Sequence, residues 1–212
     1  MNLNVLKDSS EIVNYNNPMI PIYVSKCDLD FFPNREALVH WHEDVEFLMP
    51  IKGHITYQIN GKTFSIGEGE AIFVNSRQMH YGFSSDHSNC EYICITFNPR
   101  SLFTLSSIQH QYVDPILDCN QTQLIITNEN EAGRSILASI QQLDQIYLQK
   151  VDIEIKAMGC LYRLWESLFF LMKPFFVQEI SKYDANLPTL KKMLLYIYQN
   201  FEIGRASCRE RV

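Results

Sequence analysis

The sequence predicts an α+β protein in which a small, jelly-roll-like antiparallel β-barrel comes first and helices follow. From about residue 20 to residue 99 the chain consists of short β-type runs separated by turn residues. After residue 130 apolar residues recur at spacings of three and four, as they do on one face of a helix. Strands and helices do not alternate along the chain, which argues against a parallel sheet.

The clearest β element is a hairpin. HITYQI (54–59) alternates, Asn60-Gly61 tolerates the positive φ angles of a tight turn, and KTFSI (62–66) returns. AIFV (71–74) is typical of a short buried strand, and CEYICITF (90–97) of a longer strand ended by Asn98-Pro99. Together these runs predict a barrel over residues 21–115, preceded by an arm (1–20) that is either regulatory or frayed.

Two amphipathic helices and the short link 150–152 between them predict a helical hairpin over residues 130–175. One open alternative is that the helices only pack on the outside of the barrel. The second helix is apolar on almost all sides, however, and this favours a homodimer. The predicted dimer helices carry Ile136, Ile140, Leu143, Leu161, Trp165 and Leu168.

The C-terminal part contains weaker signals. Residues 176–187 have little periodicity and are predicted to be a linker, and residues 188–203 form an amphipathic pattern typical of a further helix. The last residues, 204–212, are basic without apolar periodicity, and we interpret them as a non-native tail.

Charge and composition exclude several classes of function. The net charge of −6 opposes binding to phosphate backbones, and no basic patch precedes the last eight residues. The N-terminus lacks the pattern of a secretory signal, and no apolar run has the roughly 20 residues that a membrane helix needs. We therefore expect a cytoplasmic protein without a membrane partner, in which the six cysteines are reduced thiols.

Three histidines and one glutamate form the most distinctive pattern. His40 and His42 are two residues apart in an expected strand, so their side chains share a face, and Glu46 has the same parity if that strand continues. His80 follows a turn after AIFVNSRQM. These four side chains are predicted to converge inside the barrel.

This pattern resembles the first cupin motif, in which HxH is followed by three residues, Glu, six residues and Gly: His40, His42, Glu46 and Gly53 fit each position. In the second motif Gly69 and His80 match, whereas Asn75 and Arg77 stand at its proline and glycine positions. Asn34 stands where the first motif usually opens with glycine. The resemblance implies a cupin barrel that keeps the ligand positions.

Within the cupins, the chain resembles the N-terminal half of AraC-type transcription regulators. The phrases HWHEDVEFLMPIKG, YQINGK, GEGEAIFVNSRQMHYG and ITFNP follow that family's barrel in order, and the resemblance covers roughly residues 20–201. It implies a non-enzymatic sensor of a small-molecule effector, such as a sugar or related metabolite, that pairs through its two helices. Residues 188–203 resemble the first helix of the family's DNA-binding domain, so we expect the remaining helix-turn-helix part to be absent.

Two interpretations of the His/Glu set stay open. One is a divalent metal site for zinc, nickel, iron or manganese, held by His40, His42, Glu46 and His80. The other is a polar pocket that hydrogen-bonds an organic ligand, for which the resemblance requires no cofactor.

Further pocket residues are predicted from the strand 90–97. Tyr92 and Cys94 share one face and Ile93 and Ile95 the other; either the mixed-polarity face points into the barrel, or it is covered by helices. Arg35, in the loop before His40, is a further candidate.

The leading functional interpretation is an effector-sensing and dimerising module, with DNA binding only through the helix-turn-helix part. The first alternative is a metal-dependent cupin enzyme of the dioxygenase or isomerase type, which would need an open metal position. A second alternative is a passive carbohydrate-binding module, which would bind without changing the dimer.

Overall fold

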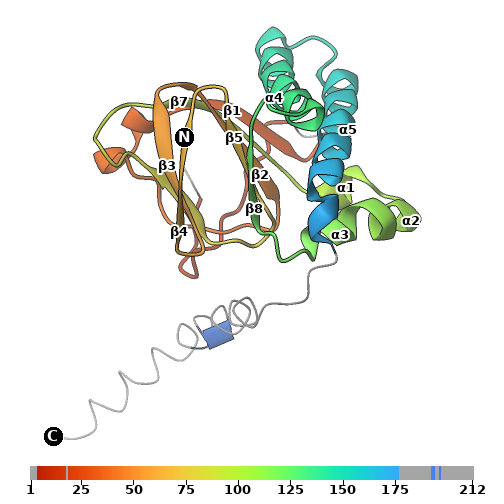
Figure 1. The fold of residues 1–212 in the computed structure, drawn as a ribbon, viewed down its shortest axis with the longest axis horizontal. Coiled ribbons are helices and arrows are strands. Elements are labelled where there is room, and N and C mark those ends of the chain that lie inside the picture. Colours follow the sequence, from red (N-terminus) through yellow and green to blue (C-terminus); the bar gives the residue numbers. More distant parts are fainter. Residues whose placement is uncertain (1–3, 18, 177–191, 194–195, 197–212) are drawn as a thin grey trace, which may run out of the picture.

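The computed structural model describes residues 4–17, 19–176, 192, 193 and 196, and it contains two antiparallel sheets that face each other as the two halves of a barrel (Figure 1). The larger sheet has the order β1-β7-β2-β5-β8 and the smaller one β4-β3-β6. The strands are β1 (Ile22–Asp28), β2 (Val45–Lys52), β3 (His54–Ile59), β4 (Lys62–Gly67), β5 (Ala71–Val74), β6 (His80–Phe83), β7 (Glu91–Phe97) and β8 (Gln123–Ile126). The predicted α+β class is confirmed, and the β3-β4 turn has the positive φ angles expected at Asn60 and Gly61.

Strict alternation in the larger sheet separates the barrel interior from the helix layer. On β2, Phe47 packs in the core cluster that includes the helices, whereas Leu48 packs in the cluster inside the barrel. On β7, Ile95 faces the helices and Cys94 the interior, in register with Phe47 and Leu48 respectively. Of the two interpretations of this strand, the structure therefore has the mixed-polarity face pointing inward.

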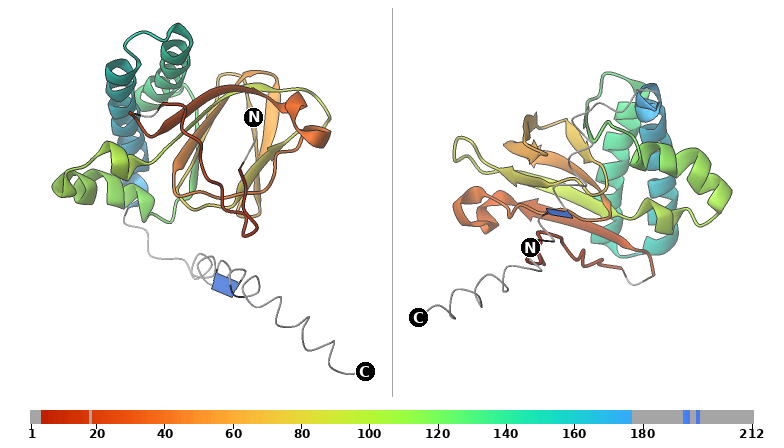
Figure 2. Two further views of the ribbon diagram at one scale, coloured as in Figure 1. Left: turned by 180° about the vertical axis from the view of Figure 1, so that it is seen from behind. Right: turned by 90° about the horizontal axis from the view of Figure 1, so that it is seen from below.

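Helices α4 (Glu131–Gln149) and α5 (Ile153–Met172) form an antiparallel hairpin on the outer face of the larger sheet (Figures 1 and 2). The Asn130 side chain caps the start of α4 by accepting a 2.7 Å hydrogen bond from the Gly133 backbone N–H. At the other end Lys150 adopts a left-handed conformation and terminates the helix. The predicted hairpin and its short link are thus confirmed.

Residues 99–126 contain short helical turns and one more strand. The turns follow β7, and β8 lies beyond residue 115, the end of the predicted barrel region. The turns are α1 (Pro99–Leu102), α2 (Ser106–Ile108), η3 (Gln109–Val113) and α3 (Asp114–Leu117), with η1 (Leu29–Phe31), η2 (Pro33–Arg35) and η4 (Lys173–Phe175) elsewhere. The turns that follow β7 contact α5: the Trp165 indole N–H donates a 3.0 Å hydrogen bond to the carbonyl oxygen of Tyr112 in η3.

The six residues named on the predicted dimer helices lie in the interior of the chain, and the dimer itself stays a prediction. All six are buried within the chain, because they form the layer between the hairpin and the sheet and so have no surface left for a second copy: Ile136, Ile140, Leu143, Leu161, Trp165 and Leu168. Full burial of a side chain of this size stabilises a fold by about 1.5–3 kcal/mol. A dimer formed through these helices would have to use their other residues.

The N-terminal segment lies against the barrel (Figure 2). Ser10 forms a bridge with Trp41, and the Glu11 backbone N–H donates a 2.8 Å hydrogen bond to the Trp41 carbonyl oxygen. In the described part of the predicted arm the chain is therefore held beside the histidine region.

The predicted linker (176–187), further helix (188–203) and tail (204–212) lie almost entirely outside the described residues and stay predictions. Among the helices that are described, none combines the length and the apolar character required to span a membrane.

Candidate functional site

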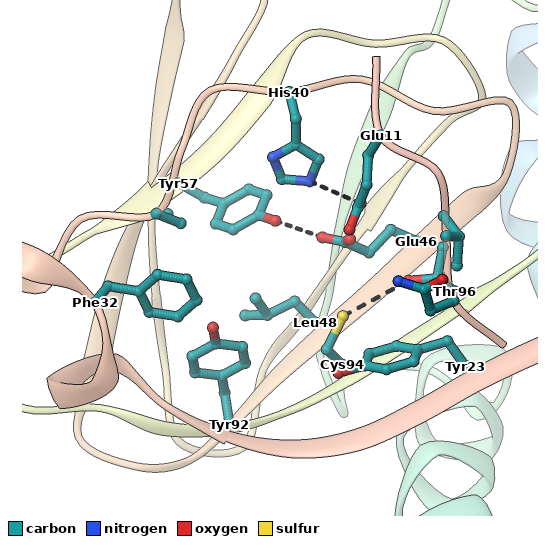
Figure 3. A pocket seen from close by; sticks show the side chains of 14 residues that line it. Glu11, Tyr23, Phe32, His40, Glu46, Leu48, Tyr57, Tyr92, Cys94 and Thr96 are labelled. Atoms are coloured by element: carbon teal, nitrogen blue, oxygen red, sulfur yellow. Dashed lines mark hydrogen bonds and ion pairs between the residues drawn. The ribbon is translucent and has the colours of Figure 1, made fainter. Parts of the chain in front are cut away.

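A cavity of about 250 Å³ opens between the two sheets, beneath the histidine region (Figure 3). Its polar end is formed by Glu11, His40, Glu46 and Thr96. Its opposite end is formed mainly by Phe32, Leu48 and Tyr92, and the Tyr57 ring extends from there to Glu46. The cavity can therefore hold a small molecule that has one polar end and one apolar end.

Glu46 connects the cavity to a buried histidine cluster. The Tyr57 hydroxyl donates a hydrogen bond to one carboxylate oxygen of Glu46. The other oxygen lies 3.5 Å from His42 Nε2 and 3.6 Å from His80 Nε2. Burial alone would raise the pKa of Glu46, but the adjoining imidazoles outweigh this effect and hold that pKa well below its usual range.

The backbone fixes which nitrogen of each imidazole carries a proton. Nδ1 lies 2.7 Å from the Leu38 carbonyl oxygen in His40, 3.0 Å from that of Asp44 in His42 and 2.8 Å from that of Gln78 in His80. Because a carbonyl oxygen only accepts, each Nδ1 is the donor and each neutral ring presents a lone pair on Nε2. Burial, and then the nearby His80, lower the pKa of His40 to about 3, so this ring stays neutral.

These side chains fit a metal ion. Ligand atoms of His40, His42, Glu46 and His80 all lie within 4.8 Å of one another. Nε2 of both His42 and His80 is buried without a hydrogen-bond partner. Each Nδ1 is held by a backbone carbonyl group, as in metal sites where such a hydrogen bond orients the ligand ring. Burial lowers the pKa of His42, but the adjoining Glu46 carboxylate outweighs this effect and raises it.

A comparison with models of protein families identifies the family. A sequence model of the AraC-like ligand-binding domain matches residues 32–159, which is more than half of the chain. The chain belongs to the AraC-like ligand-binding domain family.

A curated relative supports this assignment. This AraC-like domain is 25% identical over 194 residues to the uncharacterized HTH-type transcriptional regulator YdeC of Bacillus subtilis, with 90% of this chain and 65% of YdeC covered. The chain thus spans slightly less than two thirds of that relative.

Among solved structures, ToxT from Vibrio cholerae O395 matches 75% of this chain and 58% of its own, at 12% identity and a TM-score of 0.48. A cupin 2 conserved barrel domain protein from Salinispora arenicola matches 41% of this chain and 71% of its own, at 13% identity and a TM-score of 0.34.

Four of the predicted pocket residues line the cavity of the AraC-like domain: His40, Glu46, Tyr92 and Cys94. His42 and His80 lie behind Glu46, outside the cavity wall. His42 and Glu46 do not share one continuous strand, as the shared parity had assumed, because β2 begins only at Val45.

Arg35, which the sequence also suggested as a pocket residue, lies outside the wall of this cavity. Its guanidinium pairs with the Asp30 carboxylate and donates to the His87 carbonyl oxygen, and it does not line the cavity. This side chain instead fastens the loop that precedes the histidines.

Sequence reasoning did not identify Glu11, Phe32, Leu48 or Tyr57 as cavity residues. Leu48 and Tyr57 could have been found, since Leu48 shares the parity of Glu46 and Tyr57 that of Ile55 and Ile59 on its strand. Glu11 and Phe32 lie in irregular segments, where no periodicity indicates the direction of a side chain.

Proposed function

We propose that this chain is the effector-sensing and dimerising part of an AraC-type transcription regulator, which binds a small organic molecule between its two sheets. The cavity carries this proposal: it is lined by polar groups at one end, lies inside a ligand-binding domain, and adjoins the N-terminal segment through Glu11. A ligand that contacts both the barrel and this segment can favour one arrangement of the segment over another.

The transcriptional role rests on the resemblance to YdeC, whose name describes an HTH-type regulator. We infer DNA binding through a helix-turn-helix part and not through the barrel, because the net charge of −6 opposes contact with phosphates. Two copies are inferred to associate through exposed residues of α4 and α5.

A thermal-shift panel of sugars and other small metabolites tests the proposal. A ligand at about 100 times its Kd stabilises the folded protein by about 2.7 kcal/mol and raises its Tm. We expect Phe32→Ala to reduce the shift, because Phe32 lines the cavity. Phe31→Ala is the matched control, since Phe31 is 76% exposed and outside the cavity wall. A panel in which no compound stabilises the protein, or stabilises it equally in Phe32→Ala, contradicts the proposal.

The His/Glu cluster supports a second candidate, a metal-dependent cupin enzyme. A bound divalent ion would supply Lewis-acid chemistry, and His40, His42, Glu46 and His80 would hold it. Elemental analysis of protein purified without chelator tests this candidate against a His40→Ala/His42→Ala variant. Near-stoichiometric metal that the variant lacks would favour this candidate and require an activity screen, whereas metal-free protein that still binds an organic ligand would leave the sensor.

A further inference from the structure

The polar end of the cavity presents hydrogen-bond acceptors. The Glu11 carboxylate lies 3.5 Å from His40 Nε2, and its side chain is only 11% exposed. His40 uses Nδ1 as the donor to the Leu38 carbonyl oxygen, so Nε2 faces Glu11 with a lone pair. Glu46 already takes the hydroxyl hydrogen of Tyr57 and adds a second carboxylate. Three acceptor groups, two of them carboxylates, thus face one end of the space (Figure 3).

Glu46 is accompanied by the Tyr57 hydroxyl and, behind the cavity wall, by two imidazoles, whereas Glu11 faces the neutral His40 ring. Among the described residues that line it, none is a lysine or an arginine. A buried carboxylate is costly unless a donor or a positive charge accompanies it. For Glu11, the missing positive charge is therefore a group that the ligand itself can bring.

The other end of the cavity is aromatic. Phe32, Tyr57 and Tyr92 come from a loop, β3 and β7, and their side chains surround one space, with Leu48 beside it (Figure 3). Aromatic faces hold apolar groups and also attract cations. This end fits an apolar body attached to a positively charged group.

We propose that the effector is a small organic cation: a primary amine whose ammonium group lies between Glu11, Glu46 and His40 and whose apolar body lies among the aromatic rings. This inference rests on the proposed function and names the chemical class of its ligand. An ammonium group has three donors and a positive charge, which match three acceptors and two carboxylates. The cavity of about 250 Å³ equals the volume of roughly eight water molecules, which limits the body to about one ring.

Three probe ligands of similar size and shape test which ligand charge the cavity prefers. Isothermal titration of chelator-treated protein at pH 7.5 compares benzylamine, benzyl alcohol and benzoate, which are cationic, neutral and anionic. We expect benzylamine to bind at least about tenfold more tightly than benzyl alcohol, and benzoate not to bind. Stronger binding of the alcohol or of benzoate would overturn the inference and leave the effector sensor standing.

Matched variants locate the ammonium group. Glu11→Gln keeps the shape of the side chain and removes one negative charge, so the affinity for benzylamine should fall about tenfold. Glu43→Gln removes an exposed carboxylate outside the cavity and should leave the affinity unchanged. Phe32→Leu, with Phe31→Leu as its control, tests the aromatic end independently of Glu11. Equal affinities in all four variants would overturn the placement.

A competition experiment with zinc distinguishes an amine site from a metal site. Zinc would occupy the acceptors at His40 and Glu46, so we expect added zinc to compete with benzylamine. Binding of benzylamine only in the presence of zinc, or of benzoate to zinc-loaded protein, would contradict the inference. Failure of all three probes at millimolar concentration would also overturn it, whereas the sensor function fails only with the wider metabolite panel.

Discussion

Gly53 shows how one backbone position determines whether a side chain is tolerated. Its φ is +80°, and a Cβ atom there would lie 2.5 Å from the Asn89 carbonyl oxygen. Gly61 has a similar φ of +82°, but no atom lies within 4 Å of a Cβ built on it. The two glycines thus share the left-handed conformation and differ only in the space around them.

We predict that Gly53→Ala is the more damaging of the two substitutions. Both should lose about 1–2 kcal/mol to the left-handed conformation, and Gly53→Ala should lose at least about 2 kcal/mol more because the backbone at Asn89 must move. Urea unfolding of the two variants measures the difference. Equal losses would mean that this contact relaxes without cost.

The same conformation explains the departures from the cupin pattern. Asn34 and Arg77, which stand at glycine positions of the two motifs, have φ angles of 56° and 65°. The backbone is therefore retained although its usual residue is replaced, and asparagine tolerates this region better than most residues. Motif spacing could predict which side chains converge, because it reflects this backbone rather than the identity of each turn residue.

At the scale of elements, the alternation of side chains along a strand was predicted better than where each strand begins and ends. Alternation on 90–97 correctly grouped Tyr92 with Cys94, but both faces are apolar enough to be buried, and only the helix layer determines which one points outward. The bend before β2 could not be predicted, since residues 40–46 have a pattern that also fits an unbroken strand. Glu11 was missed because its position depends on long-range pairing with Trp41.

Helix α4 contains one buried and one exposed leucine, and replacing each by alanine distinguishes the effect of burial on stability from that of helix propensity. Leu143 is 0% exposed, in the layer between helix and sheet, and Leu148 is 62% exposed. We predict that Leu143→Ala lowers the free energy of unfolding by about 2–5 kcal/mol, since it leaves a cavity in a packed layer. Leu148→Ala should change it by less than about 0.5 kcal/mol. Thermal unfolding of both variants checks this, and similar Tm values would contradict the observed burial.

At the scale of the whole molecule, the surface available to a second copy lies on the outer side of α5. Ile155, Tyr162 and Phe170 are 75%, 42% and 59% exposed. At about 100° per residue these three side chains fall on one side of the helix, opposite the buried layer, and the exposed Glu166 lies among them. The Tyr162 hydroxyl also donates a 3.2 Å hydrogen bond to the Leu102 carbonyl oxygen. An exposed apolar stripe on a helix is costly in water and is typical of an interface.

We therefore predict a dimer that depends on this stripe and not on the buried residues of the hairpin. Ile155→Asp/Phe170→Asp should convert the dimer to a monomer in sedimentation experiments while each protomer stays folded, because both side chains are exposed within the chain. Leu38→Asp is the control, since it adds a charge at an exposed leucine outside both helices. A double variant that remains dimeric would place the interface elsewhere. Loss of the dimer in the double variant would mean that the two protomers associate by a surface separate from their ligand cavities. The effect of a bound effector would then have to reach the partner through the sheet that lies between cavity and helices.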